Sequence, residues 1–350
     1  MTTARPLRTI GAGRIATALL AAVAVGLSLG ACGTSEESPA NAPQPAGSQA
    51  PSGPWEFTDD RGTKISLPER PKRIVAQVHA AASLWDFGIK PVGVFGPQTK
   101  PDGSPDAQAG NVDLKTTTSV GSAFGEFNLE RYTRLDPDLV VTIMYGPVLW
   151  YVPQEAQPKI EQRAPIVGIR LDGKSAAEAI ARFGELARSL GADVDGDSVQ
   201  QARAGFEKAS QDLKAAAAAK PGLTVQMAIG QQEGYWVVDP KWHGDAKLFK
   251  DLGVDVVAPA DPNPAFGFEQ LSWEQATKYP ADLILEDART VGMNSDELAA
   301  KFPTWKELPA VKAGQVAPWR AETPSSYQLY TAVLTELTKT IANARTDVVA

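Results

Sequence analysis

Aromatic side chains gather in the segments that follow the predicted strands, and they could form the walls of a binding site for a bulky ligand. Aromatic rings offer large, rigid contact surfaces, and the edges of Tyr and Trp can donate hydrogen bonds. A place in the hydrophobic core explains each single ring equally well, so the hypothesis rests on the group. Its members are Phe124, Tyr145, Trp150, Tyr151, Tyr235, Trp236, Phe266, Phe268, Trp319 and Tyr327.

The polar candidates in the same segments are Arg170, Arg289, Arg320 and His79. A guanidinium donates several hydrogen bonds to ligand oxygens and keeps its charge. Arg289 follows two acidic residues, so an internal ion pair explains it equally well. The other histidine, His243, is expected to begin a helix as a capping or surface residue. Two histidines and one cysteine are too few for a protein-held metal centre, so we expect no metal and no resident cofactor.

An α/β framework must position these side chains, because short apolar runs alternate with helical segments. Near-continuous apolar runs between helices predict parallel sheets covered on both faces. We therefore predict two Rossmann-like lobes with parallel-rich sheets, and a ligand bound outside the carboxyl ends of their strands. The predicted strands are residues 73–78, 91–95, 139–144, 165–169, 224–229, 235–238, 254–258, 282–285 and 315–317. The segments that follow them are residues 79–83, 122–126, 145–151, 170–174, 231–235, 262–268, 287–292 and 319–327.

A single long helix is predicted between the two sets of strands. Ser175 and Glu178 have the spacing of a capping box, and Gly191 is placed to end the helix. Apolar residues at helical spacing form one continuous stripe along it, over a length of roughly 24 Å. A second helix is predicted over residues 198–219. A packed helix between the lobes predicts a stiff hinge.

Two stretches 144 positions apart, residues 130–141 and 274–285, resemble copies of one helix-to-strand unit. Glu130 and Glu274 begin them, and Asp138 and Asp282 precede the strand in each. This spacing is far larger than the repeat of a solenoid and indicates two similar lobes. Chance similarity is an alternative, because a proline and an aspartate often mark such turns.

The N-terminus has the pattern of an export signal. Arginines precede an apolar run over residues 15–29, which is shorter than the roughly 20 residues of a membrane-spanning helix. The run ends in Leu-Gly-Ala-Cys32, which resembles a bacterial lipoprotein box and implies acylation of Cys32. An ordinary cleavage site with an incidental cysteine is the alternative. Residues 33–54 are rich in Pro, Ala, Ser, Gly and Gln and predict a disordered tether.

The predicted organisation is therefore a signal peptide (1–31), a tether (32–54), an N-lobe (55–172), an inter-lobe helix (173–192) and a C-lobe (193–350). The net charge is −7, and removal of the three arginines of the signal changes it to −10. An acidic exported chain argues against nucleic acid as a partner. With Cys32 as its one cysteine, the chain has no disulfide framework.

At this point the chain resembles the class III solute-binding proteins of ABC importers, a group that binds ferric siderophores, cobalamin and haem. The resemblance covers roughly residues 55–345, with a periplasmic-binding domain at roughly 72–346, and rests on the order of several short motifs. These are Arg73-Ile-Val-Ala, Gly88-Ile-Lys-Pro-Val-Gly-Val, Asn128-Leu-Glu, Leu135-Asp-Pro-Asp-Leu-Val, Tyr279-Pro-Ala-Asp and Leu308-Pro-Ala-Val-Lys-Ala-Gly-Gln-Val.

The resemblance implies a monomeric receptor, anchored by lipidated Cys32 to the outer face of the cytoplasmic membrane. It would capture an iron chelate between its lobes, with the iron held by the chelator. Glu130 and Glu274 would pair with arginines of a dimeric permease that works with ATPase subunits. Two solvated glutamates that complement their helix dipoles are the alternative. The type of chelate, hydroxamate, catecholate or mixed, stays open.

Cobalamin and haem are alternative ligands, and for haem Tyr145, Tyr235 or His79 could be the axial ligand. An exported enzyme is the alternative of another class. The chain lacks Gly-x-Ser-x-Gly, His-Glu-x-x-His and a glycine-rich phosphate loop. We therefore expect a receptor and not an enzyme.

Overall fold

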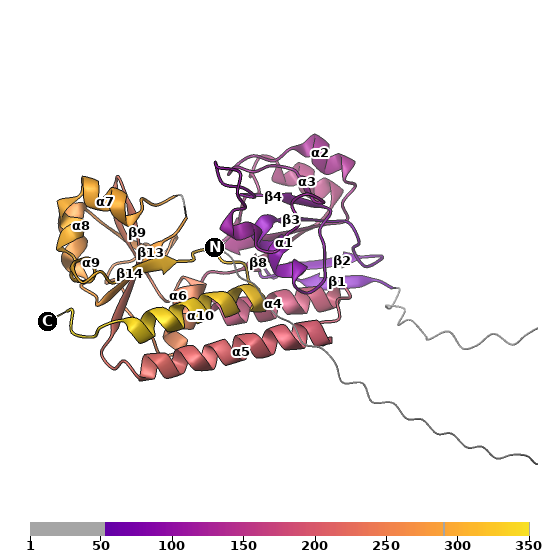
Figure 1. Ribbon diagram of the computed structural model, residues 1–350. Coiled ribbons are helices and arrows are strands. Elements are labelled where there is room, and N and C mark those ends of the chain that lie inside the picture. The colour runs from indigo at the N-terminus through magenta and orange to yellow at the C-terminus, as the bar shows by residue number, and fades with distance from the viewer. Residues whose placement is uncertain (1–52, 290, 350) are drawn as a thin grey trace, which may run out of the picture. The chain divides into compact units, whose positions relative to one another are not determined.

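The computed structural model describes residues 53–289 and 291–349. The predicted signal peptide, Cys32 and residues 32–52 of the predicted tether lie outside the described residues. Within them, two six-stranded sheets and a two-stranded hairpin are combined with helices (Figure 1). The predicted α/β class is confirmed. In the described part of the chain, no helix is both long and apolar enough to cross a membrane.

The first sheet and its helices form what we call the N-lobe. The strand order is β5-β4-β3-β6-β7, with β8 beside β6, and all pairs except β6–β7 are parallel. Its strands are β3 (Ile74–Gln77), β4 (Gly93–Phe95), β5 (Thr118–Ser119), β6 (Leu139–Tyr145), β7 (Val148–Leu149) and β8 (Ile166–Arg170), besides the hairpin β1 (Trp55–Thr58) and β2 (Lys64–Leu67). Its helices are α1 (Val78–Trp85), η1 (Ala107–Ala109), α2 (Leu129–Arg134) and α3 (Gln157–Arg163).

The second sheet and its helices form the C-lobe, with the strand order β12-β10-β9-β13-β14 and β11 beside β9. Its strands are β9 (Thr224–Gln231), β10 (Gly234–Val238), β11 (Asp255–Val256), β12 (Phe268–Leu271), β13 (Leu283–Asp287) and β14 (Val316–Trp319). Its helices are α6 (Gly244–Asp251), η2 (Trp273–Lys278), α7 (Ser295–Lys301), α8 (Pro303–Glu307) and α9 (Pro309–Lys312). Strand β10 is antiparallel to both β9 and β12. A short turn joins it to β9, whereas a parallel neighbour would need a crossover.

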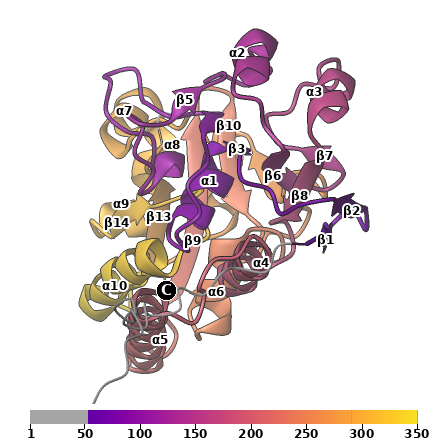
Figure 2. The same cartoon turned by 90° about the vertical axis from the view of Figure 1, so that its right-hand side faces the viewer.

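Three long helices accompany the two sheets: α4 (Ala176–Ser189), α5 (Asp197–Ala218) and α10 (Tyr327–Asn343). Helix α4 is the predicted connection, and both hydrogen bonds of the Ser175–Glu178 capping box are formed. Ile180 and Phe183 of α4 are fully buried in a core cluster that includes residues of both sheets. Helices α5 and α10 lie side by side (Figure 2). Each large buried apolar side chain stabilises by about 1.5–3 kcal/mol, so these residues fix α4 to the shared core, where it packs on β8 of the N-lobe and on α6 of the C-lobe.

The repeated aspartates have equivalent structural roles in the two lobes. Asp138, before β6, accepts hydrogen bonds from the backbone N–H groups of Lys72 and Arg73 at 2.8 and 2.9 Å. Asp282, before β13, accepts one from the backbone N–H of Thr224 at 2.9 Å. In each lobe the carboxylate thus ties the start of one central strand to the start of its parallel neighbour. The repeat reflects the same helix-to-strand connection built twice.

Candidate ligand-binding site

A cavity of about 540 Å³ is lined by residues of both lobes. This volume lies within the roughly 300–1,000 Å³ that small-molecule sites commonly have. Seven of the predicted site residues line it, and they come from α1, from strands β6, β12 and β14, and from the segments that follow β7, β11 and β13. They are His79, Tyr145, Trp150, Phe266, Phe268, Arg289 and Trp319.

The cavity walls are built largely of aromatic rings that meet across the two lobes. Tyr145 of the N-lobe stacks on Trp242 of the C-lobe, with ring centroids 5.1 Å apart and an interplanar angle of 15°. Trp150 packs edge-on against Tyr145 at 5.1 Å. His243 lies against Trp242 and Phe268 at 4.6 and 4.3 Å. These rings offer a continuous apolar surface with few rotors to immobilise.

One buried carboxylate lies at the wall. Asp245, which is 8% exposed, accepts hydrogen bonds from the indole N–H of Trp319 and the backbone N–H of Ala246. Burial raises the pKa of Asp245, and the bond from Trp319 partly offsets this effect. Trp319 and Tyr330 are themselves buried and line the cavity beside it. Asp245 thus fixes the orientation of the Trp319 ring.

Both histidines are uncharged at neutral pH. Burial lowers the pKa of His79 and of His243 to about 3 in each case. His79 lies in α1 and its Nε2 is 3.3 Å from the hydroxyl of Ser325, whereas its Nδ1 has no hydrogen-bond partner in the described part of the chain. His243 occupies the N-cap position of α6, which confirms its predicted place at the start of a helix. Its side chain makes no capping hydrogen bond, and its ring lines the cavity.

The segment 79–83, predicted as a loop, is part of helix α1. The side-chain oxygen of Gln77 accepts hydrogen bonds from the backbone N–H groups of His79 and Ala80 and so begins the helix directly after β3. An alanine-rich sequence then favours the helix. The consequence is that His79 faces the cavity from a fixed helical turn.

Arg289 lies in the cavity wall between two carboxylates. Its guanidinium pairs with Asp287 at 2.5 Å and with Glu322 at 2.9 Å. Burial alone would lower the pKa of Arg289, but Glu322 and Asp287 raise it above its ordinary value, so the side chain stays charged. Glu322 also accepts a hydrogen bond from the side chain of Gln108 at 2.6 Å. The predicted internal ion pair is therefore present within the C-lobe, and the hydrogen bond from Gln108 links its Glu322 to the N-lobe.

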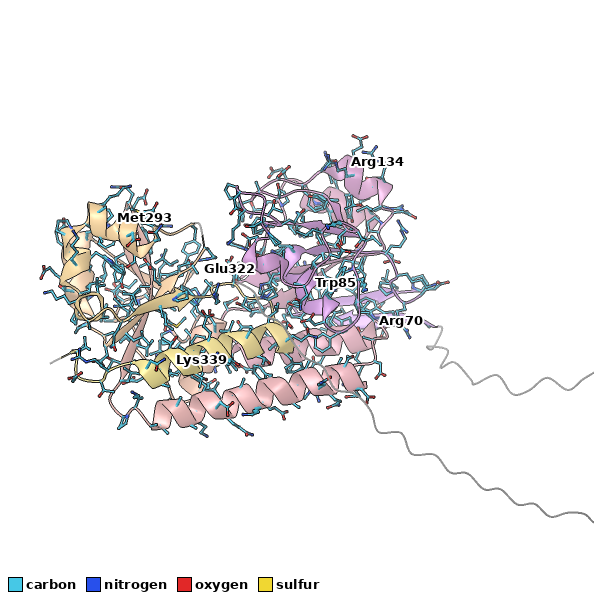
Figure 3. The ribbon with its side chains drawn as sticks, viewed as in Figure 1. Arg70, Trp85, Arg134, Met293, Glu322 and Lys339 are labelled. Carbon is cyan, nitrogen blue, oxygen red and sulfur yellow. The ribbon has the colours of Figure 1, made fainter. Side chains whose placement is uncertain are left out.

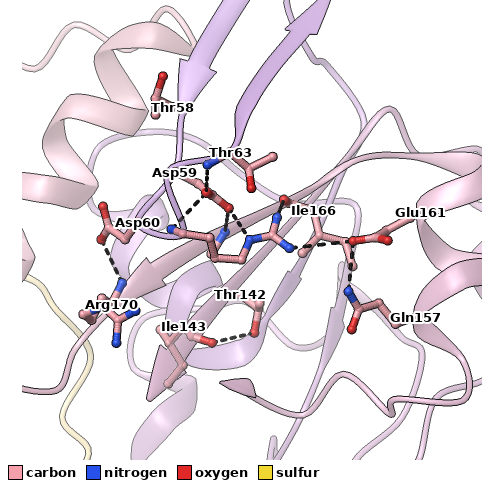
Figure 4. Close-up of polar contacts among 12 residues, drawn as sticks. Thr58, Asp59, Asp60, Thr63, Thr142, Ile143, Gln157, Glu161, Ile166 and Arg170 are labelled. Carbon is pink, nitrogen blue, oxygen red and sulfur yellow. Dashed lines mark hydrogen bonds and ion pairs between the residues drawn. The ribbon is translucent and has the colours of Figure 1, made fainter. Parts of the chain in front are cut away.

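The other two predicted arginines lie outside the cavity lining. The Arg170 side chain pairs with Asp172 at 3.3 Å, and its backbone N–H donates to Asp60 at 2.8 Å (Figure 4). Arg320 forms a two-pronged ion pair with Glu336 on α10, at 3.0 and 3.1 Å, on an exposed surface. Neither guanidinium belongs to the cavity lining: Arg170 pairs with Asp172, itself a lining residue, and Arg320 pairs with Glu336 on the outer surface.

Five predicted aromatics also lie outside the lining. Tyr235 is buried in the C-lobe core and its hydroxyl bonds Gln226. Trp236 and Tyr327 pack against the main core cluster. Phe124 and Tyr151 lie beside the cavity wall, because both rings contact Trp150. Tyr235 is therefore excluded as an axial ligand for haem, since its ring belongs to the core.

Sequence reasoning missed several lining residues, above all Trp242, Tyr330, Asp172, Lys174 and Glu322. Trp242 follows the antiparallel strand β10, whereas ligands are expected at the carboxyl ends of parallel strands. Asp172, Lys174 and Glu322 lie within predicted segments, but acidic and lysine side chains were not considered. No group of three or more His, Cys, Asp or Glu side chains suited to a metal ion occurs among the described residues.

A ligand-sized cavity between two α/β lobes joined by a helix defines an extracytoplasmic solute receptor of class III architecture. The chain belongs to the periplasmic binding protein family, whose profile matches residues 75–323. Proteins of this family bind solutes for transport and are not enzymes. Comparison with curated proteins yields no match.

Several solved structures are similar to this chain. DesE, a ferric-siderophore receptor protein from Streptomyces coelicolor, is 40% identical with a TM-score of 0.78, and the match covers 83% of this chain and 99% of DesE. A siderophore periplasmic binding protein from Thermobifida fusca is 23% identical with a TM-score of 0.56, over 79% of this chain and 98% of that protein. The petrobactin-binding protein YclQ from Bacillus subtilis is 20% identical with a TM-score of 0.60, over 82% and 98%. The last two support the fold alone.

Proposed function

We propose that this protein captures a ferric siderophore in the cavity between its lobes and delivers it to an ABC importer. The observation that carries the proposal is the 40% identity to a ferric-siderophore receptor over almost the whole of that receptor. The aromatic walls support it, because a bulky, partly apolar chelate needs broad and rigid contact surfaces. The iron arrives as cargo inside its chelator, so the protein needs no metal ligands of its own.

Tryptophan fluorescence offers a direct test, since Trp150, Trp242 and Trp319 line the cavity. Titration with ferric siderophores should quench the emission with one-to-one stoichiometry, and haem and cobalamin serve as competing ligands. Trp242→Phe should weaken binding, because it removes part of the ring that stacks on Tyr145. Trp85→Phe is the matched control, since Trp85 lies at the end of α1 outside the cavity lining. Absence of binding to every ferric siderophore would refute the proposal.

We further propose that Glu130 and Glu274 dock the receptor onto the permease. Glu130 lies on α2 of the N-lobe with its side chain 80% exposed, and Glu274 lies on η2 of the C-lobe and is also exposed. Two exposed carboxylates, one on each lobe, suit bidentate pairing with arginines of two permease subunits. Glu130 already has a weak partner in Arg134 at 3.4 Å, which a permease arginine would have to displace.

Charge reversal tests the docking. In a bacterium that depends on this receptor, the Glu130→Arg, Glu274→Arg double variant should lose most siderophore uptake while the purified protein still binds its ligand. The control carries the same charge change at Glu69 and Glu207, which are exposed elsewhere. Normal uptake by the docking variant would show that these glutamates are only solvated surface residues.

The proposed anchor is a lipid on Cys32, which supports attachment at the outer face of the cytoplasmic membrane. The sequence Leu-Gly-Ala-Cys after an apolar run supports this assignment. Cys32→Ala should release the protein from the membrane fraction. Metabolic labelling with a palmitate analogue should label the wild-type protein and not the variant. Labelling that persists in the variant would refute the anchor.

A further inference from the structure

The charged side chains that line the cavity leave no spare positive charge. Among the described residues, the acidic ones are Asp172, Asp245 and Glu322, and the basic ones are Lys174 and Arg289. Even if Asp245 is protonated, the negative charges of Asp172 and Glu322 cancel the positive charges of Lys174 and Arg289. Both histidines are uncharged. The cavity is therefore a neutral to acidic environment.

Of the two lining cations, Lys174 is exposed, and Arg289 is already neutralised by carboxylates. Asp287, 4% exposed, holds one side of the guanidinium, and Glu322 holds the other at 2.9 Å. Glu322 lies where the lobes meet (Figure 3) and has a left-handed backbone, with φ of 57°. The main chain thus holds a sparsely populated conformation at the residue that delivers this second carboxylate.

We propose that Glu322 is a specificity-determining residue, which selects uncharged or cationic ferric chelates and rejects anionic ones. This inference rests on the proposed siderophore-binding function and deepens it. A ferric tris-hydroxamate is uncharged, or cationic where it carries a free amine, and can use the aromatic walls. A ferric tris-catecholate is strongly anionic, so it would meet Glu322 with no free guanidinium to compensate. In a partly desolvated cavity, like charges a few ångströms apart repel strongly.

The test is Glu322→Gln, which removes the charge and keeps the length and hydrogen-bonding capacity of the side chain. Its affinity for a ferric tris-catecholate should rise by at least about tenfold, because one nearby repulsive charge is lost and Arg289 gains a free side. Its affinity for an uncharged ferric tris-hydroxamate should change by less than about threefold. Glu336→Gln is the matched control, since Glu336 also pairs with an arginine but lies outside the cavity.

A second variant covers the case in which Glu322→Gln does not fold. Asp172→Asn also removes a lining carboxylate, and its side chain accepts a hydrogen bond from the backbone N–H of Gly146 at 2.8 Å, which an amide oxygen can retain. It should likewise favour the tris-catecholate relative to the tris-hydroxamate. In the wild type, the discrimination against the anionic chelate should weaken as salt is added.

The outcomes separate this inference from the proposed function. If the wild type binds the hydroxamate and catecholate chelates equally, or if folded Glu322→Gln leaves their ratio of affinities unchanged, charge selection by Glu322 is refuted and the receptor function stands. If Glu322→Gln does not fold, an unchanged ratio in Asp172→Asn refutes it likewise. If the wild type binds neither of these chelates nor any other ferric siderophore, the siderophore function itself is refuted. A selective gain for the anionic chelate in Glu322→Gln, absent in Glu336→Gln, supports the inference.

Discussion

Gly267 controls the position of a cavity ring, and replacing it by alanine should disturb stability and ligand binding together. Gly267 has a φ of 68°, and a Cβ atom there would lie 2.5 Å from Cγ and Cδ2 and 2.6 Å from Cβ of Trp242. The last of these atoms is fixed to the main chain, so a new rotamer alone cannot relieve the clash. The backbone around residues 239–243 would have to move, although the Asp239 N–H is bonded to the Gly267 carbonyl at 2.8 Å.

Two costs add up in Gly267→Ala. A left-handed conformation costs an alanine about 1–2 kcal/mol, and forcing extra atoms into a packed site costs about 1–3 kcal/mol more. We expect the free energy of unfolding to fall by about 2–5 kcal/mol. Displacement of Trp242 should weaken ligand binding by about tenfold, the effect of losing a favourable aromatic contact.

Gly222→Ala is the matched control, because Gly222 has a φ of 82° and no heavy atom lies within 4 Å of the new Cβ. It carries the backbone cost alone, so unfolding free energy should fall by about 1–2 kcal/mol and affinity should not change. Urea denaturation and fluorescence titration measure both quantities. Equal loss of stability in the two variants, with unchanged affinity in Gly267→Ala, would refute the claim that Gly267 positions the ring.

Three further predictions concern stability and use denaturant unfolding as the assay. Ser175→Ala should reduce the free energy of unfolding by about 1 kcal/mol, since it removes the cap of α4; no loss would mean that packing alone sets this helix end. Burial raises the pKa of Glu286 from 4.5 to about 7, so the free energy of unfolding should fall as the pH rises from 4.5 to 7. Glu286→Gln should therefore be more stable than wild type above pH 7, whereas the two proteins should be equally stable near pH 4. Burial alone would raise the pKa of Asp282, but hydrogen bonds from Thr224 and from the backbone of Val349 lower it. Asp282→Ala should therefore reduce the free energy of unfolding by about 2–4 kcal/mol at neutral pH, and by less as the pH falls below the ordinary pKa range of an aspartate. A loss that does not depend on pH would refute this reasoning.

The framework was predictable because its signals are local. The capping box of Ser175 and Glu178 begins α4, and apolar periodicity alone specifies the face that packs on the sheets. Asp138 and Asp282 recur because each ties two adjacent strands at the same point of the same unit. Such features depend on neighbours a few residues away or on one strand pairing, so a single sequence contains them.

The site was only partly predictable, because side-chain direction changes with each residue of a strand. Trp319 at the end of β14 faces the cavity, and the next residue, Arg320, therefore points away and reaches Glu336. Tyr235 belongs both to the segment 231–235 and to the predicted strand 235–238; β10 begins at Gly234, and the ring of Tyr235 lies in the core. A residue's place near the end of a strand therefore does not tell whether its own side chain or that of the next residue faces the ligand.

Glu322 belongs both to the cavity and to the polar connection between the lobes, and this double role bears on how charge selection works. Gln77, which begins α1, bonds Gln108 at 3.0 Å; Gln108 bonds Glu322, and Glu322 pairs with Arg289 of the C-lobe. A ligand anion that drew Arg289 away would leave Glu322 part-buried, with Gln108 as its one remaining hydrogen-bond partner among the described residues. Leaving a partly buried charge uncompensated is costly, so an anionic chelate would incur this cost at Glu322 as well as meet direct repulsion. An uncharged chelate that binds through the aromatic walls avoids both costs and leaves the Glu322–Arg289 pair intact.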